Sequence, residues 1–238
     1  MEHMEKEIVK IYEDEDILVL DKPSGLVVNR SVTSKSETLQ DILEKDYSFE
    51  SSEVTDELLD DFSERSGIVH RLDKDTSGVL VVAKNKHSFI KLISQFKERK
   101  AVKEYLGVLC GKIDDEIIEI DAPLKRNPKS PLKFAVVEGG KDAFTRFEKV
   151  KDVNLDGKDY TLMKIFPKTG RTHQIRVHSA AMGHAIAGDS IYCSTVLLET
   201  SLNHFGRLML HAEKLAFYHP KTGIFIEFVS QVPKEFAF

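Results

Sequence analysis

The sequence predicts an α+β fold built on a mixed, largely antiparallel sheet, and three observations support this prediction. Short apolar segments typical of strands outnumber the segments with helical spacing. Turn sequences such as Pro220-Lys221-Thr222-Gly223 join consecutive strands as hairpins. The regular alternation of strand and helix that builds a parallel sheet is missing from the sequence.

The strongest secondary-structure signals in the first half of the chain predict two strands and two helices. Ile17–Leu20 and Gly78–Ala83 are short apolar segments bounded by turn residues, as buried strands are. One helix is expected to begin after Thr38, whose hydroxyl can cap the first turn. Apolar residues repeat at helical spacing between Lys86 and Arg99, which indicates an amphipathic helix there.

The second half is expected to be richer in strands. The strand candidates are Tyr105–Cys110, Ala143–Val150 and Tyr160–Phe166. A helix is expected over Arg171–Met182, with Thr172 as its N-cap and Gly183 just after its end. The apolar segments between residues 208 and 229 then complete a hairpin-rich region.

Length and composition favour one cytoplasmic domain over residues 1–238. The chain is 41% hydrophobic and 31% charged, as ordinary globular proteins are. No apolar run approaches the length of a membrane span, and the charged N-terminus does not resemble a signal peptide. The two cysteines, Cys110 and Cys193, have no metal-type or redox-type spacing, so we expect a reduced protein without a structural metal.

Charge is distributed unevenly along the chain, although the net charge is −5. The segment from residue 44 to 66 carries nine acidic residues and only two basic ones, and we interpret it as a mobile, solvated insertion. Lysines and arginines cluster at 97–103, 125–133 and 164–176. Such clusters either form a positive face for nucleic-acid phosphates or are simply solvated.

Asp73 is the first candidate for chemistry, in the segment HRLDKDTSG. It lies at what looks like the end of a strand, between Arg71 and Lys74, and nearby cations favour its ionised form. An ionised carboxylate can act as nucleophile or base. The alternative is a structural salt bridge with Arg71.

The second candidate is Arg176, in the segment GRTHQIRVH. Its apolar neighbours suggest partial burial, and a buried arginine needs an anionic partner, for which Asp73 is a candidate. The alternative is an exposed arginine paired with solvent. His173 and His178 are five residues apart, a spacing that does not place two imidazoles on one helix face as a metal site would need.

Two further features are weaker. Tyr105 enters a strand and could stack on a base or move a proton, although most such tyrosines only fill space. The order Asp73-Lys74-Asp75-Thr76 is similar to the phosphoaspartate loop of haloacid-dehalogenase-type phosphatases. The fold of those phosphatases requires alternating strands and helices, so we keep the phosphatase interpretation only as an alternative.

Taken together, four segments resemble the RluA-type pseudouridine synthases. They are YEDEDILVLDKPSGLVV, HRLDKDTSG, KEYLGVL and TGRTHQIRVHSAAMGHAIAGDSIY, which occur in the family's order. The resemblance runs from Tyr12 to about Val229. It implies a mixed sheet in two halves with a central catalytic cleft. It also implies a cofactor-free enzyme that isomerises a uridine of ribosomal or transfer RNA to pseudouridine.

The resemblance also implies roles for individual residues. Asp73 matches the catalytic aspartate, Arg176 the arginine that pairs with it, and Tyr105 the tyrosine that stacks on the target base. Arg71 matches an arginine that fills the helical stack when the uridine is flipped out. By looser alignment, Leu210 forms the pocket floor, and the matching segments add Arg171, His173 and Lys22 as substrate-binding residues.

The expected partner is therefore RNA, with no membrane and no metal, and we expect a monomer. The small RNA-binding domain that the family often carries has no counterpart before Tyr12, so specificity is expected to come from the catalytic body. A non-catalytic RNA-binding protein of the same fold remains the alternative from a different functional class.

Overall fold

The computed structural model describes residues 8–30, 36–49, 57–128, 130 and 133–238. The chain forms two compact units, the first comprising residues 1–102 with 214–231 and the second comprising residues 103–213 with 232–238. Strand β10 (Leu210–Tyr218) contributes its first residues to unit 2 and its last residues to unit 1. None of the helices in the described ranges has the length and apolar content needed to span a bilayer.

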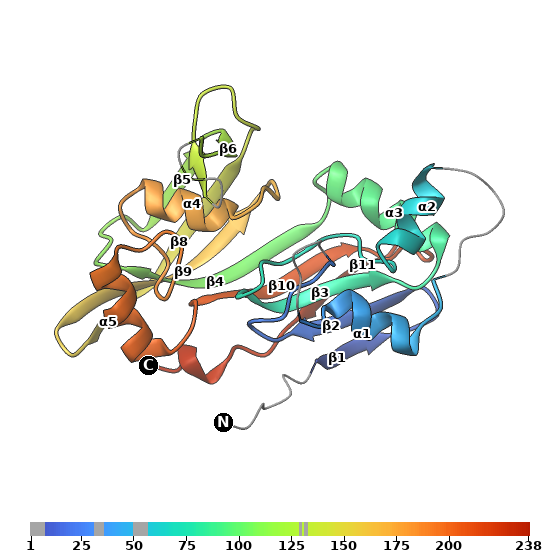
Figure 1. Cartoon of the computed structure of the whole chain (residues 1–238), viewed down its shortest axis with the longest axis horizontal. Helices are drawn as coiled ribbons and strands as arrows, with labels where there is room; N and C mark the ends of the chain where they lie inside the picture. The colour runs from blue at the N-terminus through green and yellow to red at the C-terminus, as the bar shows by residue number, and fades with distance from the viewer. Residues whose placement is uncertain (1–7, 31–35, 50–56, 129, 131–132) are drawn as a thin grey trace. The chain divides into compact units, whose positions relative to one another are not determined.

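Unit 1 is a small antiparallel sheet with three helices. Its strands and helices are β1 (Val9–Glu13), β2 (Ile17–Lys22), α1 (Leu39–Asp46), α2 (Glu57–Glu64), β3 (Ser77–Ala83), α3 (Lys86–Lys97), the end of β10, and β11 (Phe225–Val229). The strand order is β1-β2-β3-β10, and β11 pairs with β10 (Figure 1). All seven residues of β3 are buried, as its continuous apolar sequence predicts.

Unit 2 contains the longer strands. Its elements are β4 (Val102–Cys110), β5 (Ile117–Asp121), β6 (Leu124–Arg126), β7 (Phe134–Val136), β8 (Phe144–Leu155), β9 (Lys158–Pro167), α4 (Gln174–Ala181), α5 (Thr195–Phe205), the start of β10 and a final 3₁₀ turn, Lys234–Phe236. The order is β10-β4-β9-β8-β5, while β6 and β7 form a separate hairpin (Figure 1). Helix α4 contacts β7, β8 and β9.

These elements confirm the α+β prediction. Every strand pair of defined register is antiparallel: β1–β2, β2–β3, β4–β9, β5–β8, β6–β7, β8–β9 and β10–β11. The phosphatase alternative requires a parallel sheet, so the fold does not support it. Helix α1 has the expected cap, since the Thr38 hydroxyl accepts from the Asp41 N–H and the Asp41 carboxylate accepts from the Thr38 N–H.

Three expectations about local structure were wrong. Asp73 does not end a strand but lies in the loop before β3. Helix α4 begins at Gln174 rather than Arg171, and Thr172 does not cap it, because His173 takes the N-cap position in a left-handed conformation. In addition, helix α5 was not predicted; it buries Ser201 and Phe205 and leaves Val196, Leu197 and Leu202 exposed.

The acidic segment 44–66 is not simply solvated filler. Phe49 and Phe62 are buried, and their rings form an edge-to-face series with Phe89 of α3 at centroid distances of 5.7 and 5.6 Å. Aromatic pairs of this geometry bury large apolar area. Both described ends of the segment are therefore anchored in the core of unit 1, while residues 50–56 lie outside the described part of the chain.

Candidate active site

The loop from His70 to Thr76 carries Asp73 and Arg71 in unit 1. The Asp73 side chain is half-buried and Arg71 is exposed. Residues 73–76 form a turn, because the Thr76 N–H donates to the Asp73 carbonyl oxygen at 3.2 Å. Asp73 thus lies on a loop that leads directly into the fully buried strand β3.

The backbone of this loop is held from β2 and the turn after it. The ammonium of Lys22, a fully buried residue, donates to three carbonyl oxygens at 2.8–3.0 Å, those of Pro23, Leu26 and Lys74. The Ser24 hydroxyl donates to the Asp75 carbonyl at 2.7 Å. These three bonds all go to backbone oxygens, so Lys22 helps to fix the loop that carries Asp73.

His70 supports the loop from the other end. Its Nε2 accepts the Val81 N–H at 3.1 Å, which fixes the tautomer with the proton on Nδ1. Its ring stacks on Phe96 of α3 with a centroid distance of 4.5 Å. Together with Lys22, this histidine holds both ends of the loop, and sequence reasoning gave neither residue that role.

In unit 2, the turn before α4 is organised by Gln174. Its side-chain oxygen accepts from the Thr169 hydroxyl at 2.6 Å and from the Arg171 N–H at 3.0 Å, while its amide donates to the Phe144 carbonyl at 2.9 Å. The Arg171 guanidinium donates through Nε to the Asp142 carbonyl at 3.0 Å. These bonds replace the cap expected from Thr172 and fix where the helix begins.

Arg176 is almost fully buried on α4, at 3% exposure, and it makes a two-point ion pair. Its Nε donates to Oδ2 of Asp189 at 2.7 Å and its Nη2 donates to Oδ1 at 2.8 Å. The expectation that a buried arginine needs an anionic partner is thus met by an acid that sequence reasoning did not single out. Asp189 could have been singled out from the segment AIAGDSIY, where it follows a glycine within one of the four segments that resemble the family.

Tyr192 joins this pair to the start of α4. Its ring lies 5.4 Å from the Arg176 guanidinium carbon, and its hydroxyl bonds to Nδ1 of His173 at 3.0 Å. The same hydroxyl accepts the Phe134 N–H of β7 at 2.9 Å. Tyr192 therefore connects the loop after Asp189, helix α4 and the β6–β7 hairpin.

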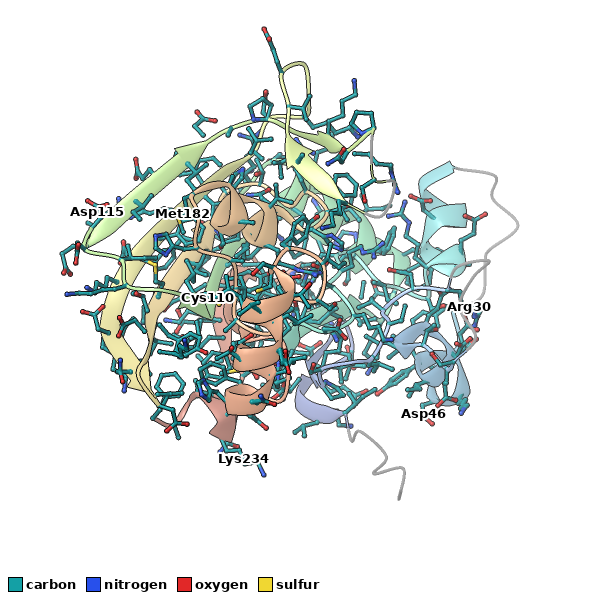
Figure 2. All side chains as sticks on the ribbon, turned by 60° about the vertical axis from the view of Figure 1, so that its left-hand side comes forward. Arg30, Asp46, Cys110, Asp115, Met182 and Lys234 are labelled. Carbon is teal, nitrogen blue, oxygen red and sulfur yellow. The ribbon has the colours of Figure 1, made fainter. Side chains whose placement is uncertain are left out.

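Tyr105 and Leu210 lie in strands of unit 2. Tyr105 is half-buried on β4, opposite Ile165 of β9, and packs against the core cluster of the unit. Leu210 is buried at the start of β10. Figure 2 shows the side chains around these strands, with Cys110 marking the end of β4 and Met182 the end of α4.

Among the described residues, one cluster has metal-binding composition: Asp14, Asp16 and His219 of unit 1. Nδ1 of His219 accepts two backbone N–H groups at 3.2 Å, so its Nε2 carries the proton that is donated to Asp14 at 2.9 Å. A metal would need that Nε2 lone pair. The hydrogen bonds therefore favour a structural role for the cluster, in which His219 links Asp14 to the turn after β10, over a metal site.

The predicted residues fall into two groups. Unit 1 holds Asp73, Arg71 and Lys22 on or beside one loop. The residues in unit 2 are Tyr105, Arg171, His173, Arg176 and Leu210. Chemically, the first group presents a partly exposed carboxylate on a braced loop, and the second presents an oriented guanidinium and an aromatic ring.

Comparison with known proteins places these features in one family. A family model described as RNA pseudouridylate synthase matches residues 16–181, which include Asp73, Tyr105 and Arg176. An uncharacterized RNA pseudouridine synthase of Aquifex aeolicus is 40% identical, over 95% of this chain and 70% of its own length. Ribosomal large subunit pseudouridine synthase D of Pseudomonas aeruginosa is 36% identical, over 97% of this chain and 70% of its own length.

Solved structures agree with this comparison. Human RNA pseudouridylate synthase domain containing 1 superposes with a TM-score of 0.74 at 27% identity, covering 96% of this chain and 84% of that chain. Human RNA pseudouridylate synthase domain containing 4 superposes with a TM-score of 0.69 at 21% identity, covering 96% of this chain and 90% of that one, which supports the fold alone.

Proposed function

Because the chain belongs to the RNA pseudouridylate synthase family and is an RNA pseudouridine synthase, we propose that Asp73 is the acid that carries its reaction. In this isomerisation the bond between N1 of uracil and C1′ of the ribose breaks and the uracil turns. C5 then bonds to C1′ and loses its proton, while N1 takes up a proton, so the atoms balance. Nothing is oxidised or reduced. The observation that carries the assignment is the segment HRLDKDTSG, which lies within the matched residues 16–181.

The environment of Asp73 supports this role. The carboxylate is partly exposed, whereas the backbone around it is held by Lys22, Ser24 and His70. A reacting group held by rigid surroundings needs less reorganisation in the transition state. Three roles are open to Asp73: attack on C1′ of the ribose, attack on C6 of the base, or assistance to proton loss from C2′. Each role requires the ionised carboxylate, which a nearby guanidinium would stabilise.

We assign the remaining contacts in the same way. Arg176 pairs with the Asp73 carboxylate in the RNA complex, and Tyr105 stacks on the flipped uracil, because aromatic rings bind unstacked bases. Leu210 forms part of the pocket floor. Arg71, which is exposed, fills the gap that the uridine leaves in the RNA helix, since a planar guanidinium can stack on bases.

The phosphate contacts we propose come from Arg171 and His173, at the start of α4, where backbone N–H groups also favour anions. Lys22 acts through the loop it holds rather than by touching RNA. We further propose that the enzyme works as a monomer without metal or cofactor. The substrate we favour is large-subunit ribosomal RNA, with transfer RNA as the alternative, because relatives at 35–36% identity are named ribosomal large subunit pseudouridine synthase D.

The test is tritium release from RNA labelled at C5 of uridine, with chelator present. Wild-type protein should release tritium, and Asp73→Asn should lose on the order of 10³-fold or more in rate while RNA affinity changes little. Asp75→Asn is the matched control, since Asp75 lies in the same loop and should tolerate the change. Normal turnover by Asp73→Asn would refute the assignment. RNA binding without release by wild type would favour the non-catalytic alternative.

A further inference from the structure

The two cysteines of the chain lie together in unit 2, although they are far apart in the sequence. Cys110 ends β4, and its N–H donates to the Ala185 carbonyl at 2.9 Å. The Cys193 thiol donates to the carbonyl of the next residue, Ile186, at 3.2 Å. The two thiols also share a hydrogen bond, and both side chains belong to or pack against the same apolar cluster. The fold therefore brings together two thiols that their spacing in the sequence did not connect.

The two thiols differ in burial and in acidity. Both are free thiols, but Cys110 is only 5% exposed, whereas Cys193 is partly exposed. The hydrogen bond from Cys193, together with burial, raises the pKa of Cys110. For Cys193 the same bond lowers the pKa, burial opposes this change, and a backbone hydrogen bond from Asp189 lowers it further. Because the thiolate is the reactive form of cysteine, Cys193 combines the greater thiolate fraction with the better access to solutes.

We propose that Cys193 and Cys110 are a modification site that forms a disulfide when the protein meets a hydroperoxide. The Cys193 thiolate attacks the peroxide O–O bond and becomes a sulfenic acid, and the leaving alkoxide takes up a proton to give an alcohol, or water where the oxidant is hydrogen peroxide. The Cys110 sulfur then attacks the Cys193 sulfur, and the thiol proton leaves with the hydroxyl group as water. The two sulfurs together lose two electrons and the peroxide gains two, so atoms and electrons balance.

Formation of the disulfide moves Cys193 more than Cys110. Cys110 lies in β4, where its backbone pairs with Tyr160 of β9 and also bonds to Ala185. Cys193 lies in the turn before α5, where its N–H donates to the Asp189 carbonyl at 3.1 Å. A disulfide holds its sulfurs about 2 Å apart, closer than two hydrogen-bonded thiols, so the turn is drawn toward the end of β4.

The turn that moves carries two residues that contact Arg176. Asp189 pairs with the Arg176 guanidinium, and the ring of Tyr192, which directly precedes Cys193, lies 5.4 Å from the guanidinium carbon. Because the rate of an enzyme depends on how accurately its side chains are positioned, the disulfide slows pseudouridine formation, and its reduction restores the rate. This consequence rests on the proposed function, whereas the disulfide itself does not.

The test exposes the reduced protein to hydrogen peroxide and maps its cysteine peptides by mass spectrometry without reduction. Wild type should give one linked pair of peptides, about 2 Da lighter than the two thiol peptides together. Peptides are measured rather than the intact protein, because the five methionines also take up oxygen. Cys110→Ala removes the second thiol, so dimedone should trap Cys193 as the sulfenic acid. Cys193→Ser should leave Cys110 as a thiol over the same time, because Cys110 is buried.

Turnover of labelled RNA is the second readout. Peroxide should slow wild type by about fivefold or more, with recovery after dithiothreitol, and should slow Cys193→Ser by less than about twofold. The absence of a linked peptide in wild type, whether the thiols stay reduced or Cys193 takes up oxygen, would overturn the disulfide. A linked peptide with unchanged turnover would overturn the effect on the reaction. No turnover by reduced wild type would overturn the proposed function, while a linked peptide would still support the disulfide.

Discussion

Two aspartates in the two units have nearly the same local bonding and different partners. Oδ1 of Asp14 in unit 1 accepts the N–H groups of Asp16 and Ile17, each at 2.8 Å. Oδ1 of Asp189 in unit 2 accepts the N–H groups two and three residues further along. Each acid then accepts from a basic side chain, His219 for Asp14 and Arg176 for Asp189.

The difference lies in the basic partner and in how deeply each pair is buried. Nδ1 of His219 accepts two backbone N–H groups and its Nε2 proton goes to Asp14, so the imidazole joins two turns and has no further capacity. Arg176 donates two N–H groups to Asp189, and both members of this pair are almost fully buried, whereas the Asp14 side chain is 28% exposed. Removal of one partner should therefore cost more at the buried pair of unit 2 than at the partly exposed pair of unit 1.

The largest effect is expected from Arg176→Met. This change would leave the Asp189 carboxylate buried beside an apolar side chain, and breaking a buried pair in this way costs about 3–5 kcal/mol. Urea unfolding should show the loss as a lower midpoint. If the variant were as stable as wild type, the deep burial of the pair would have no energetic consequence, and the contrast with Asp14 would fail.

A smaller effect is expected from Asp14→Asn, about 2 kcal/mol, because bonds to a charged acceptor become weaker. Burial opposes ionisation, but the N–H groups of Ile17 and Asp16, with His219 and Tyr12, lower the pKa of Asp14 from 3.8 to about 2. Ionised Asp14 thus stabilises the protein fully above about pH 4, and this contribution is lost as the pH falls toward 2.

The pH dependence provides the measurement for Asp14. The difference in unfolding free energy between wild type and Asp14→Asn should be large at pH 5 and should narrow at pH 2.5. Asp159→Asn, which changes an exposed carboxylate, is a suitable control. A difference that stayed constant across this range would show that the charge of Asp14 does not contribute.

The smallest effect is expected from metal ions. Because the Nε2 lone pair of His219 is not available, Zn²⁺, Mg²⁺ or a chelator should move the melting temperature by less than about 1 °C, well below the shift that a bound ion produces at saturating concentration. A concentration-dependent rise with Zn²⁺ that disappears in His219→Gln would show that the cluster is a metal site after all.

Local features of this protein could be predicted from the sequence because their causes are local. The Thr38 cap, the helix after Asn85 and the turn at residues 219–223 depend on neighbours within four residues. The largely antiparallel sheet followed from strand-rich, hairpin-rich spacing. The motif segments were sufficient to indicate the family, which the comparisons confirm.

The tertiary structure decided what depends on distant partners. The sequence required an acid for buried Arg176, but only the fold shows that Asp189, thirteen positions later, supplies one. Likewise, only the fold shows that Lys22 holds the Asp73 loop and that Phe49 and Phe62 anchor the acidic segment. The physical reason is that burial and charge pairing depend on distance in space, whereas residue spacing reports only neighbours along the chain.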